Sequence, residues 1–254
     1  MAARVAILAG GKGTRFHPYT ELVPKPLIPL GPEEKPLLEY IVCWLASQGF
    51  RDFVMLLGHR WRSIVNYFGG GERLNVNICY SVDDEKYSNT GGALLKAWKK
   101  GLLGENVVVW YGDIIVELDA ANLLERHTRE GNDATLVLAA KYQVPVGVAR
   151  VGEDGRVIEL VEKPWLDMNV TIGVLALRTN VLGEAEKALG TTFDIMGDLI
   201  PWMISRNYRV KAYVHEGPWW DVGSLERYKK LNADTFSRFF ASCKALEKKP
   251  MVVV

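Results

Sequence analysis

A glycine-rich segment near the start of the chain carries the first residues whose types and spacing suggest chemistry. It runs from Ala9 to Pro29 and reads AGGKGTRFHPYTELVPKPLIP. Its glycines leave backbone N–H groups free to approach an anion closely, and Arg15 and Lys25 add positive charge. These features predict a binding site for the phosphates of a nucleoside triphosphate.

The elements around this segment predict an α/β fold. The segment follows the apolar run Val5 to Leu8, so it is expected to be the loop after the first strand. Up to about residue 140, apolar spacing alternates between two patterns. It predicts helices over 35–49, 60–68, 89–100 and 119–130, and strands over 53–57, 76–82, 106–111 and 134–140. This alternation is typical of a doubly wound, mostly parallel sheet with right-handed crossovers.

The pattern changes after residue 140. Strands are expected at short spacing over 144–151, 157–162 and 170–177, with Glu153-Asp154-Gly155 as a hairpin turn. This spacing predicts an antiparallel portion beside the parallel half. Helices over 181–189 and 195–206, a strand over 209–214 and a long helix over about 225–246 are expected to complete the chain.

Two common phosphate-binding motifs do not fit the glycine-rich segment. A Walker loop ends in Gly, Lys and then Ser or Thr, whereas Lys12 stands here between Gly11 and Gly13. The dinucleotide fingerprint requires a third glycine where this chain has Phe16. The sequence therefore argues against both a Walker-type nucleotidase and a nicotinamide cofactor.

The composition limits the class of partner. The chain has 254 residues, 31 Lys plus Arg and 30 Asp plus Glu, so its net charge of +1 gives no field that recruits nucleic acid or an anionic membrane. No apolar run approaches the roughly 20 residues of a membrane span. Cys43, Cys79 and Cys243 are widely spaced, and we expect unpaired thiols in the cytoplasm and no zinc site.

The glycine-rich segment resembles the signature of the sugar-phosphate nucleotidyltransferases, also called nucleotide-sugar pyrophosphorylases. Other landmarks similar to those of that family follow in the same order. They are NTGGAL from Asn89, Tyr111-Gly112-Asp113, Val146-Gly147-Val148, Glu162-Lys163-Pro164 and Trp220-Asp221-Val222-Gly223-Ser224. The resemblance covers roughly Val5 to Tyr228 and is closest to mannose-1-phosphate and heptose-1-phosphate guanylyltransferases. It implies a Rossmann-like, three-layer αβα fold with a smaller antiparallel sugar-binding portion.

The resemblance also implies a division of the chain and a set of site residues. We expect one domain over 1–254, with a nucleotide-binding half over about 1–140, a sugar-phosphate-binding half over about 141–228 and a C-terminal helix over about 225–246. Pro250 to Val254 leaves no room for a hexapeptide-repeat domain. The implied nucleotide-binding residues are Leu8, Ala9, Gly10, Gly11, Lys12, Gly13, Thr14, Arg15, Asp83, Thr90, Gly91 and Gly92. Those implied for the sugar phosphate are Gly147, Glu162, Lys163 and Thr171.

Arg15, Lys25, Asp113 and Lys163 are the expected catalytic residues, and Asp113 and Asp221 are the expected metal ligands. Mg²⁺ binds one or two carboxylates together with phosphate oxygens, which these two acids would supply. A strand-end Asp also serves as a helix or turn cap, and Glu162-Lys163 also reads as a solvated ion pair. The family often has Asn where this chain has Thr171, which affects the contact to the sugar hydroxyls.

The segment before Asn89 bears on the choice of base. Asp83, Asp84 and Glu85 are acids, and a carboxylate accepts well from the adjacent N1–H and N2–H₂ donors of guanine. Relatives that select uridine or thymidine often carry Gln here, so the acids favour GTP. The alternative is that the three acids form a solvated turn.

The sequence thus predicts a cytoplasmic, Mg²⁺-dependent enzyme that joins a nucleoside triphosphate, GTP by preference, to a sugar 1-phosphate and releases pyrophosphate. Two alternatives stay open: the same chemistry with UTP or dTTP on a glucose-type 1-phosphate, and a regulator that binds sugar nucleotides without turnover. We expect a homo-oligomer, because symmetric dimers are the commonest assemblies of soluble proteins.

Overall fold

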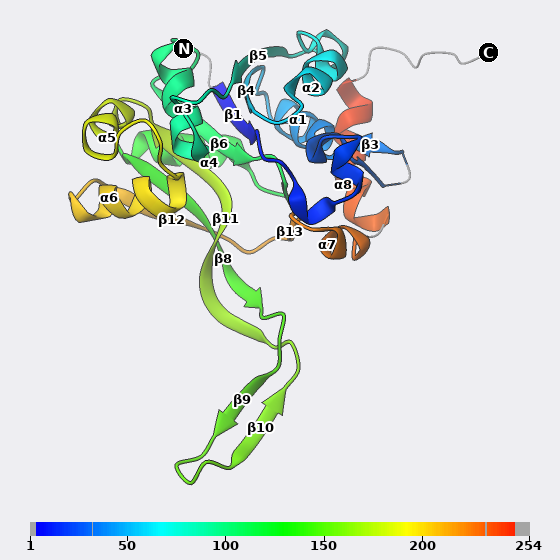
Figure 1. Cartoon of the computed structure of the whole chain (residues 1–254), viewed down its shortest axis with the longest axis vertical. Coiled ribbons are helices and arrows are strands. Elements are labelled where there is room, and N and C mark those ends of the chain that lie inside the picture. The colour runs from blue at the N-terminus through cyan, green and yellow to red at the C-terminus, as the bar shows by residue number, and fades with distance from the viewer. Residues whose placement is uncertain (1–3, 32, 232, 247–254) are drawn as a thin grey trace.

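The computed structural model describes residues 4–31, 33–231 and 233–246. A seven-stranded sheet runs through its middle in the order β12-β8-β11-β6-β1-β4-β5 (Figure 1). Four neighbouring strands are parallel: β6 (Asn106–Tyr111), β1 (Arg4–Ala9), β4 (Asp52–Leu57) and β5 (Asn77–Val82). β12 (Val210–His215) runs parallel to β8 (Ala134–Gln143), and β11 (Trp165–Arg178) is antiparallel to both β8 and β6.

Helices cover both faces of this sheet and enclose one hydrophobic core on each. The first core is closed by α1 (Leu37–Ser47), α2 (Trp61–Phe68), α4 (Ala120–Arg129) and α8 (Ala233–Leu246). The second is closed by α3 (Asn89–Lys99), α5 (Val181–Leu189) and α6 (Ile200–Ser205). The three layers confirm the predicted αβα class.

Strand β1 shows why the sequence forms this sheet. Val5 and Ile7 face the first core and Ala6 faces the second, and all three side chains are fully buried. A strand that is buried on both faces needs a continuous apolar run, which is how parallel strands read in a sequence. The carboxyl ends of the parallel strands then meet at one edge of the sheet.

Several short elements were not predicted from the sequence. Three 3-10 turns follow β1: η1 (Thr14–Phe16), η2 (Tyr19–Glu21) and η3 (Lys25–Leu27). The two-residue strands β2 (Pro29–Leu30) and β3 (Lys35–Pro36) pair with each other, and η4 (Glu72–Leu74) precedes β5. β7 (Ile114–Val116) pairs antiparallel with β13 (Trp219–Asp221), which brings two distant segments together.

The antiparallel hairpin after residue 140 is confirmed. β9 (Val148–Val151) and β10 (Val157–Val161) pair antiparallel, and the turn between them is closed by hydrogen bonds between Gly152 and Arg156 and between Gly155 and Gly152. The ends of β8 and β11 carry this hairpin away from the rest of the molecule (Figure 1). We call Lys141 to Thr171 the arm, and none of its residues is buried.

Two helix predictions need correction. The long helix expected over 225–246 is two helices, α7 (Leu225–Lys229) and α8. A hydrogen bond from the Leu231 N–H to the Tyr228 carbonyl closes α7. The helix expected over 195–206 begins as a π-helical turn, η5 (Ile195–Leu199), and continues as α6. The expectation about Pro250 to Val254 lies outside the described residues.

The expectation of unpaired cysteines is wrong for two of the three. Cys43 in α1 and Cys243 in α8 form a disulfide with Cα atoms 4.8 Å apart, and Cys79 is free and exposed. The two cysteines are 200 positions apart in the chain, so no local pattern indicated this pairing. Tyr40 against Phe236 and Trp44 against Phe239 place the two helices side by side. No helix among the described residues is long and apolar enough to cross a lipid bilayer.

Candidate functional site

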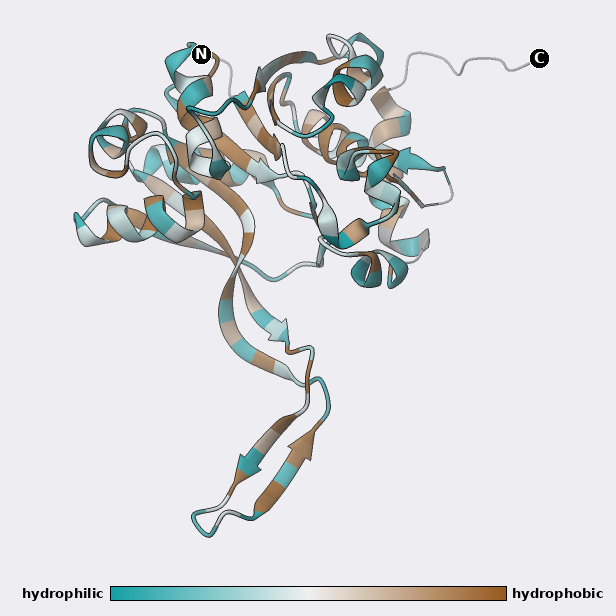
Figure 2. Cartoon of the chain, in the orientation of Figure 1, coloured by the Kyte–Doolittle hydropathy of each residue, from teal (hydrophilic) through white to brown (hydrophobic). Residues whose placement is uncertain are grey.

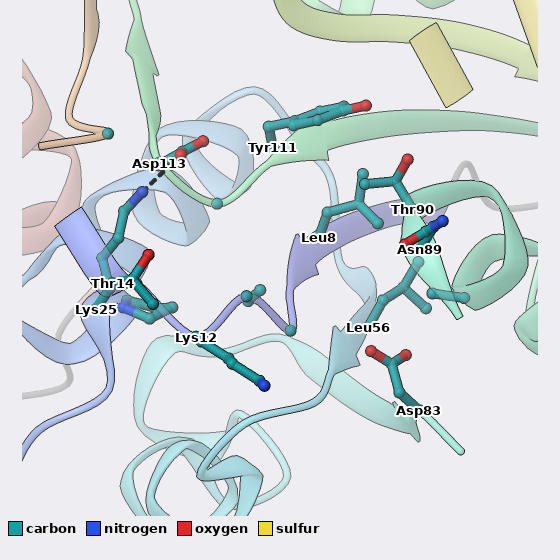
Figure 3. A pocket seen from close by; sticks show the side chains of 18 of the residues that line it. Leu8, Lys12, Thr14, Lys25, Leu56, Asp83, Asn89, Thr90, Tyr111 and Asp113 are labelled. Atoms are coloured by element: carbon teal, nitrogen blue, oxygen red, sulfur yellow. Dashed lines mark hydrogen bonds and ion pairs between the residues drawn. The ribbon is translucent and has the colours of Figure 1, made fainter. Parts of the chain in front are cut away.

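A cavity of about 450 Å³ opens at the carboxyl ends of β1, β5 and β6. Open α/β sheets commonly bind ligands at this edge. Figure 3 shows Lys25 and Asp113 on one side of the cavity and Asp83 on the other, with Leu8 and Leu56 between them. The lining residues are Leu8, Ala9, Gly10, Gly11, Lys12, Gly13, Thr14, Arg15, Lys25, Pro26, Leu56, Asp83, Asn89, Thr90, Ala93, Tyr111, Gly112, Asp113 and Gly223.

The glycine-rich loop is anchored at its far end and open where it meets the cavity. The ring of Phe16 is buried, and the hydroxyl of Thr20 donates to the Gly13 carbonyl at 3.2 Å. Lys12 and Arg15 are exposed, and neither has an ion pair with another residue in the described ranges. Two cations beside a glycine-rich loop are suited to the charge of a polyphosphate.

Lys25 and Asp113 form the closest ion pair of the cavity. Nζ of Lys25 lies 2.6 Å from Oδ2 of Asp113, and the two side chains are 12% and 27% exposed. Lys25 also lies over the ring of Phe16, 5.7 Å from its centre. Asp113 follows β6, so the pair joins the first loop of the sheet to the end of a neighbouring strand.

Backbone hydrogen bonds hold the segment of Asp221 beside that of Asp113. Asp221 pairs with Ile114 in the β7–β13 ladder, and the Val222 N–H donates to the Asp113 carbonyl at 2.8 Å. The Asp221 carboxylate accepts from the Gly223 N–H at 2.6 Å and pairs with Arg227. Asp221 is not among the lining residues, whereas Asp113 is.

The two carboxylates therefore differ in how well they fit a divalent cation. Asp113 is partly exposed and faces the loop expected to hold phosphates, which suits a Mg²⁺ ligand. Each oxygen of Asp221 already accepts a hydrogen bond, which leaves this carboxylate fewer lone pairs for a cation. A second group of possible ligands, Glu39 with Cys43 and Cys243, is buried, and its sulfurs are bound to each other.

Asp83 is the one acid of the 83–85 segment that lines the cavity. Its backbone N–H donates to the Leu57 carbonyl at 2.7 Å, which turns the side chain toward Gly10 and Gly58. A Cβ at Gly10 would lie 2.8 Å from Oδ2 of Asp83 and 3.0 Å from the backbone nitrogen of Gly58, so glycine leaves room for this close approach. Burial raises the pKa of Asp83 from 3.8 to about 6, with Lys96 opposing the shift.

Unlike Asp83, Asp84 binds the turn before α3 and does not line the cavity. Its carboxylate accepts from the N–H groups of Lys86 and Tyr87 and pairs with Lys96 at 2.8 Å. These contacts close the turn before α3, and hydrogen bonding to Lys96 holds the pKa of Asp84 below its ordinary value. The alternative that these acids form a solvated turn therefore fits Asp84, whereas Asp83 points into the cavity (Figure 3).

The start of α3 is tied to the chain ahead of α6. The hydroxyl of Thr90 donates to Asp194 at 2.7 Å and accepts from the Ile195 N–H at 2.9 Å. The N–H groups of Gly91 and Gly92 both donate to the Phe193 carbonyl. A Cβ at Gly91 would lie 2.2 Å from the Phe193 ring, so this glycine permits close packing. Thr90 lines the cavity, and the two glycines do not.

The residues expected to bind the sugar phosphate lie on the arm and not in the cavity lining. They are Gly147, Glu162, Lys163 and Thr171. Nζ of Lys163 lies 3.4 Å from Oε1 of Glu162, and the side chains are 55% and 69% exposed. The Lys163 backbone has φ of 48°, a left-handed conformation that is uncommon outside glycine. Charge from Lys163 contributes to lowering the pKa of Glu226 in α7, after the larger effect of Lys230.

Seven lining residues are not among the site residues predicted from the sequence. They are Pro26, Leu56, Asn89, Ala93, Tyr111, Gly112 and Gly223. Most belong to motifs already quoted, so the motif itself was the signal that could have identified them. Leu56 belongs to no motif, because it is a buried residue near the end of β4.

Comparisons with known proteins show the family of the chain. A sequence model of the family described as nucleotidyl transferase matches residues 4–238. A UTP–glucose-1-phosphate uridylyltransferase of Synechocystis sp. is 28% identical over 251 residues, which cover 92% of this chain and 64% of that protein. A D-glycero-alpha-D-manno-heptose 1-phosphate guanylyltransferase of Aneurinibacillus thermoaerophilus is 29% identical over 228 residues, which cover 90% of this chain and 96% of that protein.

A solved structure supports the fold. HddC from Yersinia pseudotuberculosis aligns with a TM-score of 0.70 at 24% identity, covering 92% of this chain and 100% of that one. The chain spans a little under two thirds of the length of the Synechocystis relative and nearly all of the heptose relative. The family model spans every residue that lines the cavity. The chain therefore belongs to the nucleotidyl transferase family of enzymes.

Proposed function

We propose that the chain joins GTP to a sugar 1-phosphate of the mannose or heptose type, giving a GDP-sugar and pyrophosphate. The observation that carries the choice of base is Asp83, which lines the cavity away from the Lys25–Asp113 pair. An ionised carboxylate accepts the adjacent N1–H and N2–H₂ donors of guanine, and uracil or thymine offers no such pair. The 29% identical relative from A. thermoaerophilus is named as a guanylyltransferase, which supports this proposal.

The sugar phosphate needs no general base in this reaction. Its second pKa is near 6, so it is largely a dianion at neutral pH. One of its oxygens forms a bond to the α-phosphorus, and the bond from that phosphorus to the bridging oxygen of pyrophosphate breaks. The electron pair leaves with the pyrophosphate, so positioning and charge do the catalysis.

Each residue has a defined task in this proposal. The loop from Gly10 to Arg15 would hold the triphosphate, with Arg15 on the departing pyrophosphate and Lys25 near the α-phosphate. Lys163 on the arm would hold the sugar phosphate. Residues 1–140 would thus form the nucleotide-binding half and residues 141–228 the sugar-phosphate-binding half, within one domain.

Asp113 would hold Mg²⁺, and Asp221 beside it would supply a second carboxylate. When bound, the cation neutralises phosphate charge in the transition state. Asp113 now pairs with Lys25, so binding of the cation would free the ammonium group to contact the triphosphate. The residues around Asp113 are therefore suited to exchanging an internal ion pair for contacts to the substrate.

Transfer from UTP or dTTP to a glucose-type 1-phosphate is the second candidate. The 28% identical relative from Synechocystis, named as a uridylyltransferase, favours it. A screen of GTP, UTP, dTTP and ATP against mannose, heptose and glucose 1-phosphates, with pyrophosphate measured, separates the two. We expect turnover with GTP and a manno-configured sugar. Exclusive use of UTP or dTTP would refute the role of Asp83, and no pyrophosphate with any pair would support a non-catalytic binder.

A further inference from the structure

Two polar side chains on one side of the cavity have no hydrogen-bond partner in the described part of the chain. Asp83 follows β5, Asn89 begins α3, and both line the cavity. Within the described ranges, the Asp83 carboxylate accepts no hydrogen bond and the side-chain amide of Asn89 makes none. Their neighbour Thr90 differs, because its hydroxyl donates to Asp194 and accepts from the Ile195 N–H. The carboxylate and the amide are therefore available to a ligand.

An apolar wall lies between these two side chains. Leu8 of β1 and Leu56 of β4 are paired in register, and β5, which ends just before Asp83, is the next strand. Helix α3 packs against β4 and β5, and Figure 2 shows the central strands as largely hydrophobic and α3 as mixed. Ala93 follows Asn89 by one turn of α3 and also lines the cavity. Figure 3 shows Leu56 between Asn89 and Asp83.

A flat ring lying on this apolar wall would present its edge to both polar groups. An ionised carboxylate only accepts hydrogen bonds, whereas an amide also donates them. The two side chains therefore match a ring edge on which an N–H group stands beside a carbonyl oxygen. Guanine has this edge, because its N1–H adjoins O6, and Asp83 takes N1–H in the proposed function. Adenine has an acceptor in place of N1–H, so it would set an acceptor against the Asp83 carboxylate.

The backbone of Asn89 gives a second reason to assign a task to its amide. Its φ is 61°, a left-handed conformation in which glycine is less strained. Asparagine with this conformation is ordinary after a helix end, as at Asn75 after η4 and Asn207 after α6. Asn89 is instead the first residue of α3. Among the described non-glycine residues with positive φ, it is the one that lines the cavity. Such strain at a binding site is commonly kept for function.

We propose that the side-chain amide of Asn89 binds the base of the nucleotide by donating a hydrogen bond to O6 of guanine, while Asp83 accepts from N1–H. This assignment rests on the proposed function, since it takes GTP as the nucleotide. The base lies against Leu56 and Ala93, and its edge meets one acceptor and one donor of the protein. Asn89 is thus a specificity-determining residue that reads the oxygen beside the N–H read by Asp83.

Asn89→Gly tests this contact without straining the backbone. Glycine adopts a φ of 61° readily and keeps the backbone N–H, so the variant removes the amide alone and should melt no lower than the unmodified chain. Asn75→Gly is the matched control, because Asn75 is exposed, has a φ of 54° and does not line the cavity. Equilibrium dialysis without a sugar 1-phosphate gives the Kd of GTP, of ITP and of 2-aminopurine riboside triphosphate for each protein.

We expect Asn89→Gly to weaken binding of GTP and ITP by the same factor, about tenfold, because both bases carry O6. 2-Aminopurine has hydrogen in place of O6, so its nucleotide should bind Asn89→Gly and the unmodified chain alike. Asn75→Gly should change none of the three Kd values. Unchanged binding of GTP by Asn89→Gly would overturn the proposal. An equal loss for all three nucleotides would overturn it too, since a contact to the ribose or a purely structural role gives that result.

Failure of the proposed function gives a different result. A preference of the unmodified chain for UTP or dTTP over GTP refutes the proposed base whatever Asn89→Gly does. In that case UTP and CTP decide the role of the amide, because uracil has an oxygen beside its N–H where cytosine has an amine. A loss in Asn89→Gly with UTP and not with CTP would support an amide that reads the oxygen, and an equal loss with both would overturn it.

Discussion

The ammonium group of Lys25 lies 2.6 Å from a carboxylate oxygen of Asp113, although 88 positions separate the two residues in the chain. The pair connects the loop after β1 to the end of β6 and leaves both side chains partly open to the cavity. A lysine and an acid that neutralise each other do not need a ligand for stability. The site can thus exist before the substrate arrives and exchange partners when it does.

Replacing either member of this pair should reduce turnover. We expect Lys25→Met and Asp113→Asn each to lower kcat about 100-fold or more, because the first removes a positive charge near the α-phosphate and the second removes a ligand of the proposed Mg²⁺. Steady-state kinetics with pyrophosphate detection measures this. Glu130→Gln, which breaks the Arg126–Glu130 pair on α4, is the control and should leave kcat unchanged. Full activity in Asp113→Asn would refute the metal assignment.

Guanine binding should depend on pH through Asp83. Its pKa is about 6, so the carboxylate is ionised at pH 8 and largely protonated at pH 5. Only the ionised form accepts both guanine donors, so the KM for GTP should rise about tenfold as the pH falls from 8 to 5. Asp83→Asn should abolish this dependence and the preference for GTP. Asp84→Asn, which alters the turn outside the cavity, should keep both.

The same residue should lower stability at high pH. The folded-state pKa of Asp83 lies above its ordinary value of 3.8, so its contribution favours folding below pH 3.8 and is lost as pH rises through about 6. We therefore compare the free energy of unfolding of Asp83→Asn with that of the unmodified chain. This difference should favour the variant more at pH 8 than at pH 4. Urea denaturation at both pH values measures the difference. An equal change at both values would contradict this expectation.

The polar edge of the sheet was predictable because its signals are local. An apolar run followed by glycines, or by Gly112-Asp113, indicates a strand end and its loop without knowledge of distant residues. Parallel strands bring such ends to one edge, so Gly10, Asp83 and Asp113 meet around one cavity. Pairings between distant segments were not predictable in this way. β7 and β13 are three residues long, too short for a periodic pattern, and they meet only in the folded chain.

The direction of the arm could not be predicted from the sequence either. The turn at Glu153 to Gly155 identified a hairpin, but the path of a hairpin relative to the body depends on the long strands that carry it. β8 and β11 continue past the sheet, and this continuation moves Lys163 out of the cavity lining. A motif that identifies a residue does not give its position in the folded chain.

Lys163 gives a prediction that distinguishes the sugar phosphate from the nucleotide. Lys163→Ala should raise the KM for the sugar 1-phosphate about 10-fold to 100-fold, because it removes a charged hydrogen-bond donor. The KM for GTP should not change. Lys141→Ala is the matched control, since Lys141 is an arm lysine that pairs with Asp167. Similar kinetics for both variants would assign Lys163 to the solvated ion pair with Glu162.

The disulfide should contribute measurably to stability. Closing a loop of 200 residues restricts the unfolded chain by about 5 kcal/mol in the entropy model, and measured values commonly run from about 2 to 5 kcal/mol. Cys243→Ser should lower the free energy of unfolding by such an amount. Cys79→Ser, at the free exposed thiol, should not. A strong reductant should lower the stability of the unmodified chain and have little effect on Cys243→Ser.

The disulfide between α1 and α8 also affects how the chain folds during its synthesis. Cys43 is made early and Cys243 about two hundred residues later, so the covalent bond forms only after nearly all of the described chain has been synthesised. Until then the α1 surface that meets Phe236 and Phe239 has no cover, although the strands beneath it are complete. Domains fold largely as the chain emerges from the ribosome, and exposed apolar surface at that stage promotes aggregation. Helix α8 thus completes the first core, whose other described elements can assemble before it.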